Sequence, residues 1–82
     1  MRKEQLNQPS FIEDLNLLAC FDLKNLELGI KVRQDCEPAM QAAALRLHAK
    51  GIITSADGGF LTPFGVILLE HLDHLLMALV TE

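Results

Sequence analysis

The first hydrophobic pattern along the chain follows a polar segment and repeats at helical spacing. Apolar residues three and four positions apart lie on one face of a helix; here they are Phe11, Leu15 and Leu18. Ser10 and Glu13 have the spacing of a capping box, in which each side chain binds a free backbone N–H of the other residue. The pattern predicts a helix that begins at Ser10 and ends near Phe21, after a flexible N-terminal segment at 1–9.

The next stretch interrupts the helical pattern. Asp22 or Asn25 is suited to cap a second, short helix through Leu28, and Gly29 would end it. Residues 30–32 then alternate apolar, polar and apolar, which indicates an extended segment and predicts a short strand.

The most regular helical stretch covers residues 36–50 and follows Asp35. Its body is rich in alanine, and Pro38 falls in its first turn, where the missing N–H of proline costs no hydrogen bond. Gly51 is placed to end the helix in a left-handed conformation. We therefore predict a helix over 36–50.

A hairpin and a long helix are predicted for the rest of the chain. Two β-prone runs, 52–55 and 60–61, flank an Asp-Gly-Gly turn, and glycine accepts the positive φ that such turns require. Thr62 followed by Pro63 then opens a helix that runs to about Val80. The expected fold class is mostly α with a small β-hairpin (α+β).

Length and composition limit the architecture. The chain has 82 residues and is 50% hydrophobic, which fits a single domain over 10–82 and leaves apolar surface for self-association. Cys20 and Cys36 form no CxxC pair, so free thiols are expected. The polar start and the absence of a long apolar run predict a cytoplasmic protein with no membrane span.

The formal net charge of −4 disfavours nonspecific nucleic-acid binding, which depends on an excess of Lys and Arg. The charge is unevenly distributed. Residues 24–50 hold five basic and three acidic residues, a net charge of +2, whereas residues 51–82 hold four acidic residues and no basic one. An anionic partner is therefore expected to meet the middle of the chain.

The segment "LRLHAKGIITSADGGFLTPFG" resembles the part of winged helix-turn-helix regulators that joins the third helix to the wing hairpin. The whole chain also resembles a family of small uncharacterised bacterial proteins, some loosely labelled as related to a DNA-binding inhibitor, through "LNLL…FDL…GIKV" and "L…KG.IT..DGG.LT..G". The resemblance implies a winged-helix-like fold with three helices, a wing hairpin and a long C-terminal helix. It also implies that the 36–50 helix enters the major groove of DNA and that the 54–61 wing touches the backbone. The candidate DNA contacts are Lys31, Arg33, Arg46, His48 and Lys50.

The 36–50 helix departs from that pattern on its outer side. Its core face is formed by Met40, Ala43, Ala44 and Leu47. The opposite side should carry polar residues that read bases, but it gathers Ala42, Leu45 and Ala49. These three residues are candidates for a protein-contact face; the alternative is a surface with a few isolated apolar side chains.

The last helix carries more apolar surface than one small core needs. Its broad apolar arc predicts a helix-to-helix homodimer, with the candidate interface residues Leu68, Leu69, Leu72, Leu75, Leu76 and Leu79. The alternative is that this helix is buried at the centre of its own monomer.

The two histidines of the last helix raise the question of a metal site. His71 and His74 lie three positions apart, a spacing that can place two ligands on one face, but a zinc site wants about four ligands. We expect a solvated polar strip, and no metal, cofactor or catalytic residue. The sequence predicts a non-enzymatic, homodimeric regulatory module that binds a protein partner, with direct DNA binding as the alternative.

Overall fold

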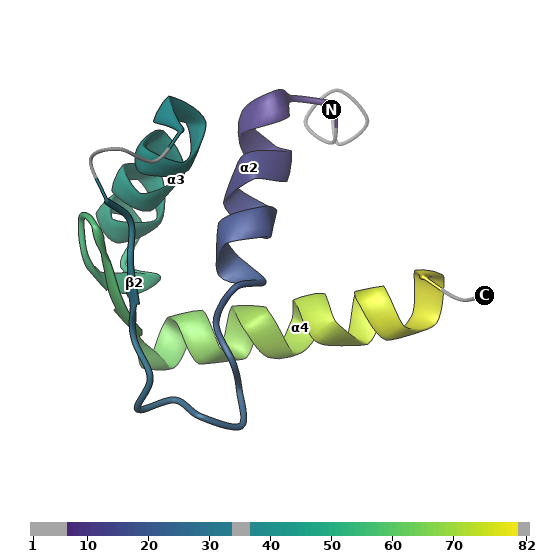
Figure 1. Cartoon of the computed structure of the whole chain (residues 1–82). Helices are drawn as coiled ribbons and strands as arrows, with labels where there is room; N and C mark the ends of the chain where they lie inside the picture. Colours follow the sequence, from purple (N-terminus) through teal and green to yellow (C-terminus); the bar gives the residue numbers. More distant parts are fainter. Residues whose placement is uncertain (1–6, 34–36, 81–82) are drawn as a thin grey trace.

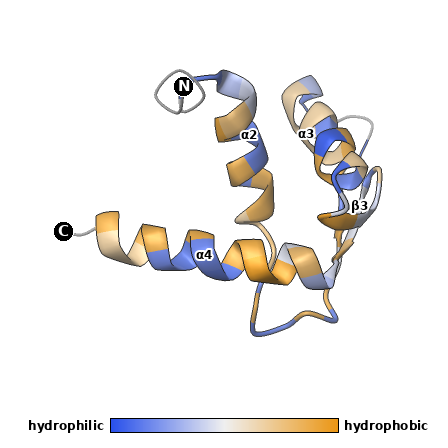
Figure 2. Ribbon diagram, turned by 180° about the vertical axis from the view of Figure 1, so that it is seen from behind, coloured by the Kyte–Doolittle hydropathy of each residue, from blue (hydrophilic) through white to orange (hydrophobic). Residues whose placement is uncertain are grey.

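The computed structural model describes residues 7–33 and 37–80. Within these residues, three helices pack with a three-stranded antiparallel sheet, which confirms the α+β class. Helices α2 and α3 stand side by side with the sheet beyond α3, and helix α4 runs across their ends and extends past α2 (Figures 1 and 2). Sheet strands and helices therefore surround one core, and one end of α4 lies outside it.

Helix α2 spans Pro9–Leu18, so it begins and ends earlier than predicted. The expected capping box at Ser10 is wrong: Gln8 is the N-cap residue, no side chain caps the helix, and Ser10 is already helical. Pro9 explains the earlier start, because its fixed φ and missing N–H suit the first helical position. Of the predicted flexible segment 1–9, residues 1–6 lie outside the described residues, and Pro9 belongs to the helix.

The predicted short helix ending at Leu28 is wrong, because residues 22–28 form successive turns. The backbone N–H of Asn25 donates to the carbonyl of Asp22, and that of Leu28 donates to the carbonyl of Asn25. The Asp22 carboxylate also accepts from the Lys24 backbone N–H at 2.9 Å and from Asn25 Nδ2 at 3.0 Å. Such local side-chain hydrogen bonds compete with helix formation.

The strand predicted at 30–32 is confirmed as β1, which spans Ile30–Lys31. It pairs antiparallel with strand β3, Gly58–Leu61, which also pairs with strand β2, Ile53–Ser55. The sheet order is therefore β1-β3-β2. The hairpin between β2 and β3 is confirmed, but its turn is shorter than predicted: Gly58 and Gly59 are the first two residues of β3, where they have positive φ values of 124° and 77°.

Helix α3 spans Pro38–Ala49, inside the predicted 36–50. Glu37 is its N-cap residue and Pro38 falls in its first turn, as expected, whereas the predicted start at Cys36 lies outside the described residues. Gly51 has φ of 74°, which confirms the left-handed end of the helix.

Helix α4 spans Pro63–Leu79, and its predicted start is confirmed. The hydroxyl of Thr62 accepts from the Gly65 backbone N–H at 3.0 Å and donates to the carbonyl of Gly51 at 2.6 Å. Gly65 sits against the backbone carbonyl of Ile52, where a side chain would collide. These contacts fix the first turn of α4 against the end of α3 and the start of the hairpin.

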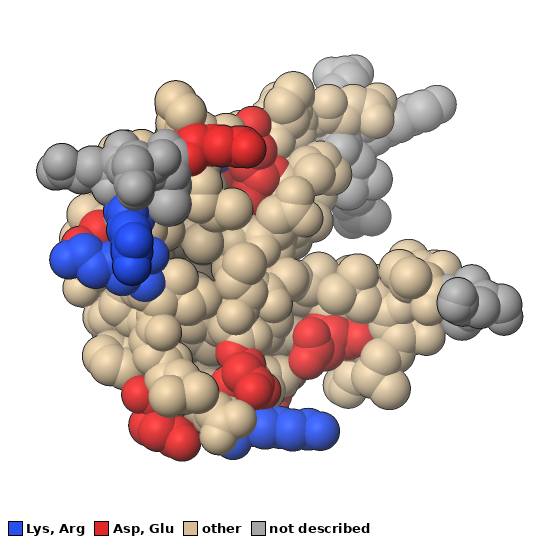
Figure 3. All heavy atoms as spheres, in the orientation of Figure 1, with Lys and Arg blue, Asp and Glu red and all other residues tan. Residues whose placement is uncertain are grey.

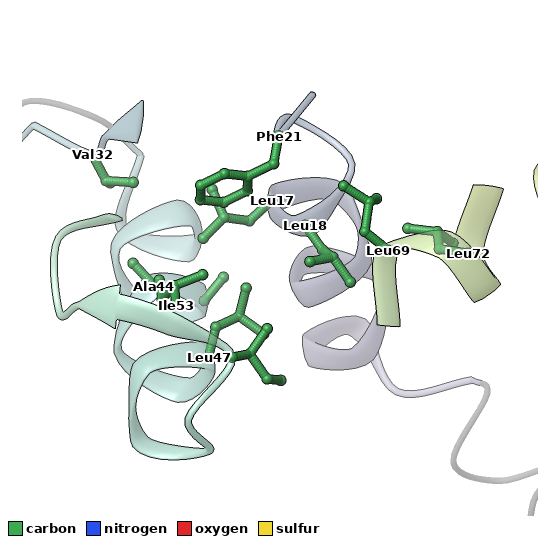
Figure 4. Close-up of a cluster of buried hydrophobic side chains, with 11 residues drawn as sticks. Leu17, Leu18, Phe21, Val32, Ala44, Leu47, Ile53, Leu69 and Leu72 are labelled. Atoms are coloured by element: carbon green, nitrogen blue, oxygen red, sulfur yellow. The ribbon is translucent and has the colours of Figure 1, made fainter. Parts of the chain in front are cut away.

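The core is assembled from every helix and from the sheet. The buried side chains of α2, α3, β2 and α4 point toward one another (Figure 4). The buried apolar residues are Leu17, Leu18, Phe21, Val32, Ala43, Ala44, Leu47, Ile52, Ile53, Leu69 and Leu72. Among residues 7–33 and 37–80, no helix has the length and hydropathy required to cross a membrane.

Candidate interaction surface

Helix α4 changes its surroundings along its length. Leu69 is 1% exposed and Leu72 is 8% exposed, because both pack into the core. The C-terminal part of α4 extends past the body of the molecule (Figure 1), and residues 75–80 are exposed. We call residues 75–80 the projecting end of α4; all six are apolar.

The projecting end is unusually exposed for apolar residues. Leu75 is 57% exposed, Leu79 is 76% exposed and Val80 is 70% exposed. Figure 2 shows the same contrast, with a hydrophilic strip along the middle of α4 and a hydrophobic end. Contiguous apolar surface of this kind marks interaction sites more often than isolated apolar residues do.

The chain as a whole exposes more surface than a compact body of its mass. Its accessible surface is 6087 Å² at 9.1 kDa, whereas a compact monomer of that mass exposes about 4,900 Å². Its radius of gyration is 12.7 Å, compared with about 11.7 Å for a compact chain of this length.

A groove lies between α2 and the middle of α4. It has a volume of about 400 Å³ and opens to solvent. We call it the α2–α4 groove. Its apolar walls are formed by Phe11, Leu15 and Leu18 from α2 and by Leu68, Leu72 and Leu75 from α4, and Leu47 and Ile52 also line it. The polar residues at this site are Asp14, Lys50 and His71. Figure 3 shows the surface hollowed between α2 and α4.

The structure divides the six predicted interface leucines into two groups. Leu69 and Leu72 are core residues, and Leu72 also lines the α2–α4 groove; Leu68 is half-buried. The remaining predicted residues are exposed and lie together at the end of the helix; these are Leu75, Leu76 and Leu79.

Sequence reasoning missed part of this surface. Helical spacing predicts that Phe11 shares one face with Leu15 and Leu18, yet Phe11 is 36% exposed and forms one wall of the groove. Ile12 is exposed beside it. Met77 and Val80 are exposed at the projecting end, although only the leucines of this helix were singled out. The helical spacing of Phe11 could not separate a core wall from a groove wall, because both face the same side of α2.

The outer face of α3 is the second predicted surface. Leu45 is 58% exposed, Ala49 is exposed and Ala42 is half-buried. Leu45 lines a shallow hollow of about 150 Å³, together with Val32 and Asp57. The three predicted residues therefore lie on one accessible face of α3, away from α2.

Arg46, a predicted DNA contact, instead joins two helices. Its Nε donates to Oδ1 of Asp14 at 2.9 Å, and its terminal nitrogen lies 3.3 Å from the Glu13 carboxylate. The hydrogen bond to Asp14 and, more weakly, the Glu13 carboxylate raise the pKa of Arg46 above its ordinary value. The guanidinium is held against α2 and does not point away from the body toward a ligand.

The other predicted cations do not gather with Arg46. Lys31 lies 3.6 Å from the Asp57 carboxylate, and both side chains are mostly exposed. Arg33, His48 and Lys50 are exposed. On the face seen in Figure 3, the described Lys and Arg side chains lie in a small group at the left edge and at the bottom, with acidic side chains next to both places.

His71 and His74 of α4 are exposed. They line a hollow together with Glu70, Asp73 and Leu23. Within the part of the chain that the structure describes, no three His, Cys, Asp or Glu side chains are grouped closely enough to hold a metal ion. Cys20 is exposed and carries a free thiol. His71 and His74 thus lie in the solvated strip of the helix.

Comparison with known proteins adds one relationship. No curated protein and no solved structure shows a significant match to the chain. Residues 5–80 match the profile of a protein family described as a family of unknown function (DUF5669). Since the match covers nearly the whole chain, this protein belongs to the DUF5669 family.

Proposed function

We propose that this protein is a non-enzymatic, regulatory interaction module that forms a homodimer through α4. The observation that carries the proposal is the projecting end of α4. Its five large apolar side chains are 41% to 76% exposed; these are Leu75, Leu76, Met77, Leu79 and Val80. An apolar helix end that leaves the core is stabilised when another apolar surface covers it.

The dimer would present two copies of the outer face of α3 to a protein partner. Leu45 is the largest exposed apolar side chain on that face, and Ala42 and Ala49 let a partner approach the helix closely. A two-fold pair displays the same surface twice, which suits a symmetrical partner. We therefore assign dimerisation to α4 and partner binding to α3.

The winged-helix-like fold belongs to this proposal. The sheet order β1-β3-β2 and a hairpin directly after α3 support it. The turns at 22–28 depart from it, because a helix-turn-helix places a helix before the recognition helix.

Direct DNA binding is the alternative function that the hairpin after α3 favours. The remaining exposed candidates for it are Lys31, Arg33, His48 and Lys50. The engagement of Arg46 by two carboxylates and the net charge of −4 argue against it. Phosphate contacts weaken steeply with salt, so a mobility shift with random duplex DNA at low and high salt separates the two functions. We expect no shift at low salt.

The homodimer is tested by measuring mass in solution across micromolar to millimolar protein. We expect a dimer of the wild-type chain and a monomer of Leu79→Glu, because the substitution places a charge on the projecting end. Leu45→Glu is the matched control, since Leu45 is also a largely exposed leucine but lies on α3. It should leave the mass unchanged and abolish capture of the protein partner from the native host.

A wild-type chain that stays monomeric at millimolar concentration would overturn the proposal. An equal loss of dimer in Leu45→Glu and Leu79→Glu would also contradict it, because the two residues lie on different faces.

A further inference from the structure

We infer that the projecting end of α4 in each protomer fills the α2–α4 groove of the other protomer. This inference rests on the proposed homodimer and specifies its geometry. The dimer is then reciprocal, since every chain supplies one helix end and one groove. The occupant of the groove is therefore a second copy of this chain.

The chemistry of the helix end matches that of the groove. Residues 75–80 carry no charged or hydrogen-bonding side chain, and the groove walls contributed by Phe11, Leu15 and Leu68 are apolar. Burying this segment leaves no side-chain polar group without a partner, so the desolvation cost that opposes most docking is small. A segment with charged side chains on every face would bury charge in the same place.

The helix end and the groove share a residue. Leu75 begins the projecting end and also lines the groove, together with Phe11 and Leu18. A two-fold axis close to Leu75 would bring two α4 helices together, with each end passing into the groove of the other chain. Isologous association requires this kind of continuous, self-complementary surface.

A single chain cannot fill its own groove in the same way. Helix α4 is continuous from Pro63 to Leu79 and contains no proline after its first turn. Its last turn therefore points away from α2, and Leu79 does not line the groove to which Leu75 contributes (Figure 1). Only another molecule can bring residues 76–80 against Phe11.

The charged residues beside the groove lie where they can remain solvated. Lys50 and His71 line the groove, and both are exposed. Asp14 is already paired with Arg46 at 2.9 Å. Entry of an apolar helix end therefore separates no ion pair and leaves no carboxylate without its cation.

Cross-linking between two different single-cysteine proteins tests the geometry. Both carry Cys20→Ser and Cys36→Ser; one then carries Phe11→Cys and the other, isotopically labelled, carries Leu79→Cys. After mixing and mild oxidation, we expect a covalent dimer that contains one labelled and one unlabelled chain. The control replaces Phe11→Cys with Phe60→Cys, since Phe60 is an exposed phenylalanine on β3, and it should give little mixed dimer.

A binding measurement supplies the second readout. Phe11→Glu should weaken dimerisation at least about tenfold, because it places a carboxylate on the wall of an apolar interface. Phe60→Glu should leave the dissociation constant unchanged. Circular dichroism confirms that both variants keep their helices, which is expected because both residues are at least 36% exposed.

The results separate this inference from the proposed function. A wild-type dimer that is insensitive to Phe11→Glu, or that shows no mixed cross-link at positions 11 and 79, would overturn the reciprocal geometry and leave the homodimer standing. A wild-type monomer would overturn both.

Discussion

The guanidinium Nε of Arg46 lies 2.9 Å from Oδ1 of Asp14, and this contact joins α3 to α2. The terminal nitrogen of Arg46 is also 2.9 Å from the same oxygen and 3.5 Å from the carbonyl oxygen of Ser10. A side chain that could have served DNA recognition is thereby held in a contact between helices. The pair also fixes which side of α3 faces α2 and which side faces solvent.

Replacing Arg46 should therefore affect folding before it affects any binding. Arg46→Gln removes the cation from Asp14 and Glu13, and we expect a lower melting temperature in thermal circular dichroism. Arg33→Gln changes the net charge equally at an exposed position and should leave the melting temperature nearly unchanged. Equal melting temperatures for the two variants would show that the pair contributes nothing to stability.

Leucines of α4 should differ sharply in their contribution to stability. Leu69→Ala opens a cavity in the core and should lower the free energy of unfolding by about 2–5 kcal/mol. Leu79→Ala makes the same change at a residue that is 76% exposed and should cost less than about 0.5 kcal/mol. Denaturant unfolding at protein concentrations low enough to keep the chain monomeric measures both. Similar losses of unfolding free energy at the two positions would contradict the conclusion that Leu79 lies outside the core.

Gly65→Ala should destabilise the protein although alanine is the better helix former. Intrinsic propensity favours alanine by about 1 kcal/mol. The added methyl group, however, would collide with the backbone carbonyl of Ile52 and press on the Leu61 side chain. Overpacking of this kind costs about 1–3 kcal/mol, so we expect a net loss in chemical denaturation. A gain in stability would mean that the first turn of α4 can move away from Ile52 without cost.

Asp22 should make the stability of the turn at 22–28 depend on pH. The hydrogen bond from Asn25, and then that from the Lys24 backbone, hold the pKa of Asp22 below its ordinary value of 3.8. The folded pKa lies below the unfolded one, so the contribution is complete above 3.8 and is lost as the pH falls through the folded value.

The comparison of wild type with Asp22→Ala tests this dependence. We expect a higher melting temperature for wild type near neutral pH, and a difference between the two proteins that narrows once the pH falls below 3.8. A difference that stays constant or grows in acid would show that the carboxylate charge does not stabilise the turn.

The sequence alone determined the elements whose signals are local. The cap at Thr62, the proline in the first turn of α3 and the positive φ of Gly51 follow from the chemistry of single residues, and the structure confirms them. Local signals failed where two of them competed. At Ser10 a capping pattern lost to Pro9 in the first helical position, and at Asp22 side-chain hydrogen bonds to a turn replaced a helix.

The tertiary structure decided which apolar positions of α4 are core and which are surface. Leu72 and Leu79 lie on the same helical face and have the same side chain, yet one is 8% exposed and the other is 76% exposed. Periodicity reports the direction of a side chain around a helix and contains no information on where the neighbouring helix ends. Burial requires atoms from other elements at the same height along the axis, and only the packed chain specifies that α4 is longer than the body it crosses.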